Sequence, residues 1–161
     1  MFKKEYILKT RKKKVIKLKF STKARYGLRV LIILGVYYNK KLLQIKDIAE
    51  REDLTEKYLE QIFISLKAAN FVKSVRGAKG GYYLSKNPSE ITIREIIERL
   101  EGSLFPTDCA ENSSVCSRSF CCVTTDLWKE LGNMIYQFLE NKTLRDLVDA
   151  YENKNQFNIQ I

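Results

Sequence analysis

The 161-residue sequence contains no histidine. Histidine is the commonest general base in enzymes and a frequent zinc ligand, so its absence excludes Ser-His-Asp and Cys-His catalytic arrangements and zinc sites that need imidazole. Most hydrolase mechanisms are thereby excluded, although the missing histidine alone does not exclude an enzyme.

Glycine and proline are also scarce, with 7 and 2 residues respectively, which favours helix over a loop-dominated or collagen-like chain. No hydrophobic run approaches the roughly 20 residues that a membrane span needs, because the longest is Val30–Val36. Lys17 and Lys19 interrupt what would be the apolar part of a signal peptide. We therefore expect a soluble cytoplasmic protein without a membrane partner.

What the chain has in excess is positive charge, +10 overall, and this charge is unevenly placed. Residues 1–19 hold nine Lys or Arg and one Glu, and residues 20–86 hold 13 basic and 6 acidic side chains. Residues 87–161 reverse the balance, with 7 basic and 12 acidic. A basic front half indicates a polyanionic partner, either nucleic acid or, as a second candidate, an anionic membrane surface.

Apolar residues at helical spacing predict a first helix capped by Ser21 or Thr22, a short second helix from Ile45 to about Arg51, and a third beginning at Thr55. The pattern then changes to β-formers on both sides of residues 76–81, where three glycines supply the positive φ that a hairpin tip requires. Three helices followed by a hairpin is the order of a winged helix-turn-helix. Arg76 and Lys79 in the tip favour DNA binding over a solvated basic loop.

A fourth helix is predicted from a capping box made by Thr92 and Glu95, ending at Glu101-Gly102. Residues 103–121 are expected to form a loop, followed by a long amphipathic helix near Trp128 and a short one over 143–151. The fold class is therefore mainly α with a small β-hairpin. We expect residues 1–18 to be a basic arm that is disordered or not native, and residues 19–87 to form the winged helix-turn-helix domain. Residues 88–122 are expected to contain a connecting helix and the cysteine loop. Residues 123–152 would then form a dimerisation helix and a C-terminal helix, and residues 153–161 a tail.

All four cysteines lie within residues 109–122, with the spacing C-x6-C-x4-C-C. Structural disulfides are rare in the cytoplasm, and a Ser- and Asn-rich loop offers no core in which to bury thiols, so the cluster indicates a metal site or redox chemistry. Zinc would have to use the adjacent pair Cys121-Cys122, which is sterically awkward for one tetrahedral ion. An iron–sulfur cluster with three thiolates and one other ligand fits better, and a metal-free thiol switch stays open.

Four ordered motifs resemble the IscR/NsrR/CymR-type winged-helix regulators of bacteria over residues 18–148. These motifs are FSTKARYGLR at 20–29, YLEQI at 58–62, VRGAKGGY at 75–82, and the cysteine loop leading to Leu127-Trp128. The resemblance implies a dimer that binds double-stranded operator DNA and, in part of the family, senses an iron–sulfur cluster, nitric oxide or redox stress.

The resemblance also implies roles for individual residues. It makes Thr55–Ala69 the recognition helix and Arg76 the wing arginine. The DNA-binding set is Ser21, Lys23, Arg25, Lys57, Tyr58, Glu60, Gln61, Arg76 and Lys79. Three cysteines match the family's ligands for a [2Fe-2S] cluster, and these are Cys109, Cys116 and Cys122.

The fourth ligand departs from the pattern, because the family's histidine position is Thr125 and its alternative carboxylate position in the first helix is Arg25. Cys121 or Asp126 would have to supply the fourth bond.

The amphipathic helix carries more apolar side chains than one exposed face should, namely Leu127, Leu131, Met134 and Phe138, which predicts a homodimer over packing on its own domain. We expect a repressor whose operator binding responds to an iron–sulfur or redox signal, with cluster-assembly or sulfur-metabolism genes as targets implied by the resemblance. The alternatives are the same regulator with a thiol switch or partner-protein control, and a small redox or cluster-carrier protein whose basic half docks an acidic partner.

Overall fold

The computed structural model describes residues 20–157. The expected basic arm and the last four residues of the expected tail lie outside this range. Within it, the helices and strands have the following bounds: α1 Thr22–Val36, α2 Ile45–Glu52, α3 Glu56–Ala68, β1 Val72–Val75, β2 Gly81–Leu84, η1 Pro88–Glu90, α4 Ile93–Glu101, α5 Asp108–Glu111, η2 Ser113–Val115, α6 Val123–Glu140 and α7 Leu144–Phe157.

The helix starts follow the capping residues that the sequence predicts. Ser21 Oγ accepts a hydrogen bond from Ala24 N at 3.1 Å, and Thr55 Oγ1 accepts one from Tyr58 N at 3.3 Å. Thr92 Oγ1 accepts from Glu95 N at 3.1 Å. These bonds satisfy amide groups that have no partner inside a helix. Among the described residues the Glu95 carboxylate accepts no reciprocal bond from Thr92 N, and it lies 4.0 Å from Lys86 Nζ.

The hydrophobic core surrounds α1, which packs against α3, α4, α7 and β2. Gly35 brings α1 and α7 close together, because a Cβ at this position would lie 2.5 Å from Val148 Cγ2. Leu144 and Val148 of α7 are fully buried in this core. Helix α7 thus packs on α1, whereas the expected division places it in one segment with α6 over residues 123–152.

The hairpin pairs β1 and β2 antiparallel, with Val72 opposite Leu84 and Val75 opposite Gly81. Its tip corrects the expectation that all three glycines serve positive φ. Only Gly77 among the three has it, with φ 113°. Gly80 allows the two arms of the hairpin tip to approach each other, since a Cβ at this position would lie 2.2 Å from Val75 O. A Cβ at Gly81 would likewise collide with the backbone of Leu43.

The back half differs from the sequence prediction in two places. The expected loop at 103–121 contains the short helices α5 and η2. Helix α7 continues to Phe157, so that the expected tail boundary at residue 153 lies inside a helix. Helix α6 begins at Val123, directly after the cysteines, where the expected division begins its segment 123–152.

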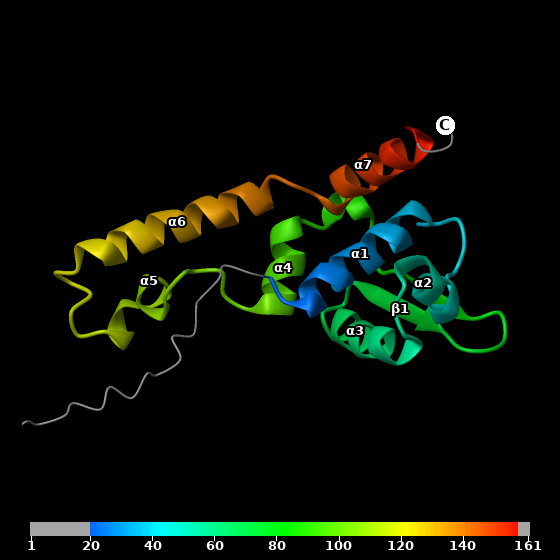
Figure 1. The fold of residues 1–161 in the computed structure, drawn as a ribbon, viewed down its shortest axis with the longest axis horizontal. Coiled ribbons are helices and arrows are strands. Elements are labelled where there is room, and N and C mark those ends of the chain that lie inside the picture. The colour runs from blue at the N-terminus through cyan, green and yellow to red at the C-terminus, as the bar shows by residue number, and fades with distance from the viewer. Residues whose placement is uncertain (1–19, 158–161) are drawn as a thin grey trace, which may run out of the picture.

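Figure 1 shows the spatial consequence of this order. Helices α1–α3 and the hairpin form one body, with α7 along α1, whereas α6 extends away from this body, and its first residues lie at the cysteine loop on the side opposite the hairpin. Helix α4 lies between the two parts (Figure 1). Across residues 20–157, none of the helices combines the length and the apolar character needed to cross a membrane.

Candidate nucleic-acid interface and cysteine loop

Helix α3 has one buried face and one polar, exposed face. Its buried side chains are Leu59, Ile62, Phe63 and Leu66. The predicted base-reading residues Lys57, Glu60 and Gln61 all lie on the exposed face. Side chains of these types can form hydrogen bonds with base edges in the major groove, so the exposed face has the chemistry of a recognition helix.

Tyr58 differs from these three residues. Its ring packs edge-on against Tyr26 of α1, with centroids 6.0 Å apart, and its hydroxyl oxygen is buried without a hydrogen-bond partner among the described residues. In this conformation Tyr58 packs α3 against α1 and its hydroxyl is buried, which argues against its predicted role in base reading.

The hairpin tip places Arg76 and Lys79 in solvent. Gln44 Nε2 at the start of α2 donates a hydrogen bond to Ala78 O at 3.4 Å, which ties the tip to the helix-turn-helix. Within residues 20–157 neither Arg76 nor Lys79 takes part in an ion pair. The tip therefore carries two cationic side chains that are free to meet phosphates or enter a narrow minor groove.

The start of α1 holds the remaining predicted DNA contacts. Lys23 and Arg25 are exposed, and the Arg25 guanidinium lies 5.8 Å from the centre of the Tyr26 ring. Ser21 is already engaged inside the protein: its amide donates to Glu101 Oε1, and its hydroxyl caps α1. Of the three predicted residues, the two cations are the better placed to contact DNA.

The four cysteines are free thiols, and Cys109, Cys121 and Cys122 contact neighbouring hydroxyl or carbonyl groups. Cys109 Sγ lies 3.4 Å from Thr107 Oγ1 and 4.0 Å from Thr125 Oγ1. Thr125, at the family's fourth-ligand position, is 1% exposed, and is thus buried beside a predicted ligand. Cys121 Sγ donates to Arg118 O at 3.6 Å.

This arrangement does not fit a metal or cluster as it stands. The described part of the chain contains no group of three or more Cys, His, Asp or Glu side chains close enough to hold a metal ion. The three predicted cysteine ligands are present in the sequence, but loop 109–122 would have to rearrange to gather them. The fourth-ligand candidates Cys121 and Asp126 are both exposed, and no metal-like geometry selects either one.

Cys122 is the thiol with the most altered acidity. Hydrogen bonding from the Thr124 hydroxyl, at 3.1 Å, is the main cause, and bonds from the side chain and amide of Thr125 add to it. Together they lower the pKa of Cys122 to about 7. Because the thiolate is the reactive form of cysteine, this residue is the best nucleophile that the geometry provides in the loop.

Helix α6 exposes a continuous apolar stripe. Its members are Val123, Leu127, Leu131, Met134 and Phe138. Phe138 is 66% exposed and Met134 60% exposed, so in this chain the stripe does not pack on its own domain. An uncovered stripe of this length is typical of a helix that meets a partner.

Sequence reasoning missed the residues that fasten the cysteine loop to α6 and α4. Tyr136 Oη accepts a hydrogen bond from Leu104 N at 3.0 Å, and the Arg94 guanidinium of α4 lies 4.8 Å from the centre of the Tyr136 ring. Phe105 packs against the same ring at 5.3 Å. The one available signal was Gly132, an isolated glycine within a helical pattern, which often marks a close packing contact.

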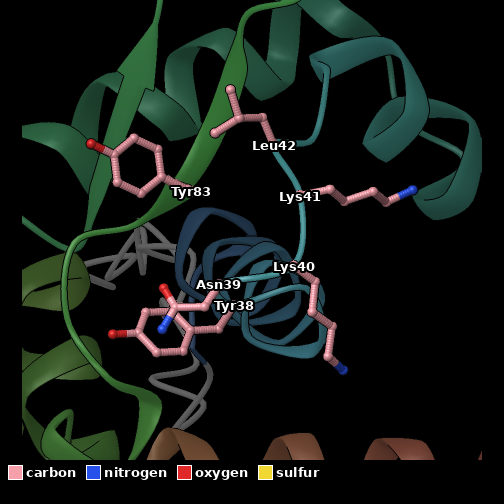
Figure 2. Close-up of a pocket in the computed structure, with 6 residues that line it drawn as sticks. All are labelled: Tyr38, Asn39, Lys40, Lys41, Leu42 and Tyr83. Atoms are coloured by element: carbon pink, nitrogen blue, oxygen red, sulfur yellow. The ribbon is translucent and has the colours of Figure 1, made fainter.

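A hollow of about 280 Å³ lies between the segment after α1 and the outer side of the hairpin. Tyr38 and Tyr83 line it, and Figure 2 shows that the side chains of Lys40 and Lys41 extend away from both rings. Because the cations and the aromatic rings do not converge, we assign no ligand to this hollow.

Comparison with known proteins agrees with this geometry. Residues 20–150 match the Rrf2 family model, described as an iron-dependent transcriptional regulator. The transcriptional regulator CymR of Bacillus subtilis is 35% identical over 139 residues, which cover 86% of this chain and 96% of CymR. The structure of this CymR, described as the global cysteine regulator of B. subtilis, has a TM-score of 0.70 at 36% identity, and the match covers 83% of this chain and 98% of CymR.

Two further solved structures are similar. The structure of T. potens IscR has a TM-score of 0.68 at 37% identity, covering 84% of this chain and 90% of that one. The oxidized form of Staphylococcus aureus CymR has a TM-score of 0.65 at 35% identity, covering 81% and 95%. The resemblance to IscR- and CymR-type regulators and the winged-helix fold class are confirmed, and these relatives form a non-enzymatic class. The chain therefore belongs to the Rrf2 family and is a helix-turn-helix transcriptional regulator of the IscR/CymR type.

Proposed function

We propose that this chain acts as a homodimeric repressor whose affinity for operator DNA is set by the chemical state of its cysteine loop. The observation that carries the proposal is the division of exposed surface between two ends of the molecule. The polar face of α3 and the cationic hairpin tip lie at one end, and the apolar stripe of α6 and the cysteines at the other (Figure 1).

DNA recognition is assigned to three groups of side chains. Lys57, Glu60 and Gln61 read base edges, because they are polar and exposed on the helix that follows the turn. Arg76, with Lys79 beside it, contacts the minor groove or its phosphates. Lys23 and Arg25 neutralise backbone phosphates near the start of α1, which adds affinity without sequence preference.

Dimerisation is assigned to the apolar stripe of α6. If two copies pack their stripes together about a two-fold axis, the two recognition helices would lie about one DNA turn apart. This arrangement predicts a roughly palindromic operator. Covering the stripe also removes exposed surface contributed by Met134 and Phe138, which favours association.

Two chemistries for the signal are supported by different observations. The family description as iron-dependent and the three cysteines in family order support an iron–sulfur cluster, which would require rearrangement of loop 109–122. The lowered pKa of Cys122 and the separate contacts of the thiols favour a metal-free thiol switch. In both cases the loop acts through its attachment to α6 and α4 at Tyr136.

The test of DNA recognition begins with selection of duplexes from a random-sequence library by the reduced wild-type protein. We expect a palindromic motif, and we expect Gln61→Ala to change base preference at defined positions while Lys154→Ala on α7 leaves it unchanged. Binding should weaken steeply with salt because phosphate contacts release counterions. No enriched motif and a shallow salt response would instead support a small redox or cluster-carrier protein.

A further inference from the structure

We propose that Arg29 and Glu52 are positioning residues for DNA recognition: their ion pair fixes the end of α2 to α1 and thereby orients the recognition helix. This inference rests on the proposed role of α3 in reading DNA. Arg29 is the last residue of the FSTKARYGLR motif and Glu52 lies outside the four motifs, and neither is assigned a DNA contact above.

Glu52 is the last residue of α2, and its side chain is only 5% exposed. Arg29 Nε of α1 contacts Glu52 Oε2. A carboxylate is doubly disfavoured at this place, because burial removes its hydration and the C-terminal end of a helix carries partial negative charge. The guanidinium offsets both effects, so the position of Glu52 depends on Arg29.

Glu52 lies three residues before the cap of the recognition helix. The chain turns immediately after it, where Asp53 adopts φ 52° and Leu54 N donates to Ala49 O at 3.0 Å. Thr55 then caps α3. With so short a connection, a displacement of the Glu52 side chain is transmitted to the start of α3, where Lys57 is exposed.

Arg29 supports the start of α3 by a second route. Its guanidinium lies 5.6 Å from the centre of the Tyr26 ring, and Tyr26 packs edge-on against Tyr58 in the first turn of α3. Arg29 therefore contacts both the residue that ends α2 and the ring that supports α3. A single side chain in this place couples the two helices of the helix-turn-helix to α1.

The competing role for Arg29 is direct contact with a DNA phosphate, since its side chain is 54% exposed and Arg25 lies one turn earlier. The two roles predict different binding behaviour. A phosphate contact strengthens binding to every duplex and adds about 0.9 to the salt slope. A positioning residue changes the preference for the correct sequence and leaves the number of phosphate contacts unaltered.

The experiment compares Arg29→Met, Glu52→Gln and the double variant Arg29→Met/Glu52→Met with the wild-type full-length protein. The probes are the duplex that the wild-type protein selects and a scrambled duplex of the same composition. Affinities are measured over a salt series, below the melting temperature of every variant. Arg145→Met is the matched control, because it removes one positive charge and a surface pair with Asp149 on α7.

We expect each single variant to lose about tenfold in the ratio of selected to scrambled affinity, with an unchanged salt slope. The singles should also melt at lower temperature, because each leaves one charge of the pair without its partner, whereas the double variant should regain melting temperature. The ratio should stay low in the double variant, since methionine packing restores stability but not the orientation imposed by the ion pair. Arg145→Met should leave the ratio unchanged.

Two results would overturn the proposal. Recovery of both melting temperature and sequence preference in the double variant would make the pair merely structural. Equal weakening on both duplexes with a shallower salt slope in Arg29→Met, together with unchanged binding by Glu52→Gln, would make Arg29 a phosphate contact. Failure of the wild-type protein to select any sequence is a separate outcome, because it contradicts the proposed DNA recognition itself.

Discussion

The Phe105 ring lies directly on Gly132 of α6, so closely that a Cβ at position 132 would be 2.2 Å from Phe105 Cδ1. Phe105 belongs to the segment that leads from α4 to the cysteines, and Gly132 is buried in the middle of α6. This contact and the Leu104–Tyr136 hydrogen bond hold the cysteine loop against α6. A change in the loop therefore has a packed route to α6, the helix that carries the apolar stripe.

Gly132→Ala should destabilise the protein although alanine is the better helix former. The added methyl would collide with a side chain that is fixed by Tyr136, and overpacking of this kind costs about 1–3 kcal/mol. The measurement is the free energy of unfolding by denaturant. Gly132→Ala in a Phe105→Leu background is the control, because a smaller side chain should relieve the collision. An equal loss in both backgrounds would contradict the packing contact.

Arg76→Ala should weaken binding to the selected duplex by about tenfold, because an exposed guanidinium at the hairpin tip is lost from the groove. Fluorescence anisotropy at physiological salt measures the effect. Lys154→Ala removes an exposed cation on α7 and serves as the control for net charge. Unchanged affinity in Arg76→Ala would contradict the assignment of the hairpin as a DNA-binding wing.

Phe138→Glu should shift the protein from dimer to monomer, because it places a charge in the apolar stripe that two copies would bury. Sedimentation velocity gives the mass directly. Asn133→Lys changes charge on an exposed residue of α6 that lies about 120° around the helix from the stripe, and it should leave the dimer intact. A Phe138→Glu protein that still sediments as the wild-type dimer would show that the interface lies elsewhere.

The thiol of Cys122 should react with iodoacetamide at neutral pH in the metal-free protein. Its lowered pKa, about 7, means that the thiolate fraction rises through neutrality, so the alkylation rate should reach half its maximum there. Peptide mass spectrometry resolves this cysteine from the other three. Thr124→Val should move the midpoint to higher pH, and Thr124→Ser should preserve it. A wild-type midpoint at about 8.5, the value of an unperturbed cysteine, would count against the hydrogen-bonded thiolate.

The starts of α1, α3 and α4 could be predicted from sequence because their signals are local. Ser21, Thr55 and Thr92 each cap the helix that follows them, and apolar periodicity marks the buried face of α3. The placement of α7 could not be predicted in this way, because its contact with Gly35 on α1 joins residues more than a hundred positions apart.

In the candidate site, too, the features that depend on local sequence could be predicted, and those that depend on contacts between helices could not. Exposure of Lys57, Glu60 and Gln61 follows from helical spacing, whereas the burial of the Tyr58 hydroxyl depends on Tyr26 of another helix. The pairing of Arg29 with Glu52 is likewise set by how α1 and α2 pack. For the cysteines, sequence spacing gives the order of the thiols but not their distances from one another.

The central claim is that the cysteine loop controls binding to operator DNA. The most direct test divides one oxygen-free preparation of the protein into three samples: reduced and metal-free, mildly oxidised, and reconstituted with iron and sulfide. The affinity of each sample for the selected duplex is measured, and its iron and acid-labile sulfide are counted. We predict that the affinity of the reduced sample differs by at least about fivefold from that of one of the other two samples. A variant with all four cysteines replaced by serine should show no difference in affinity between its samples. Equal affinity in all three wild-type samples would contradict it.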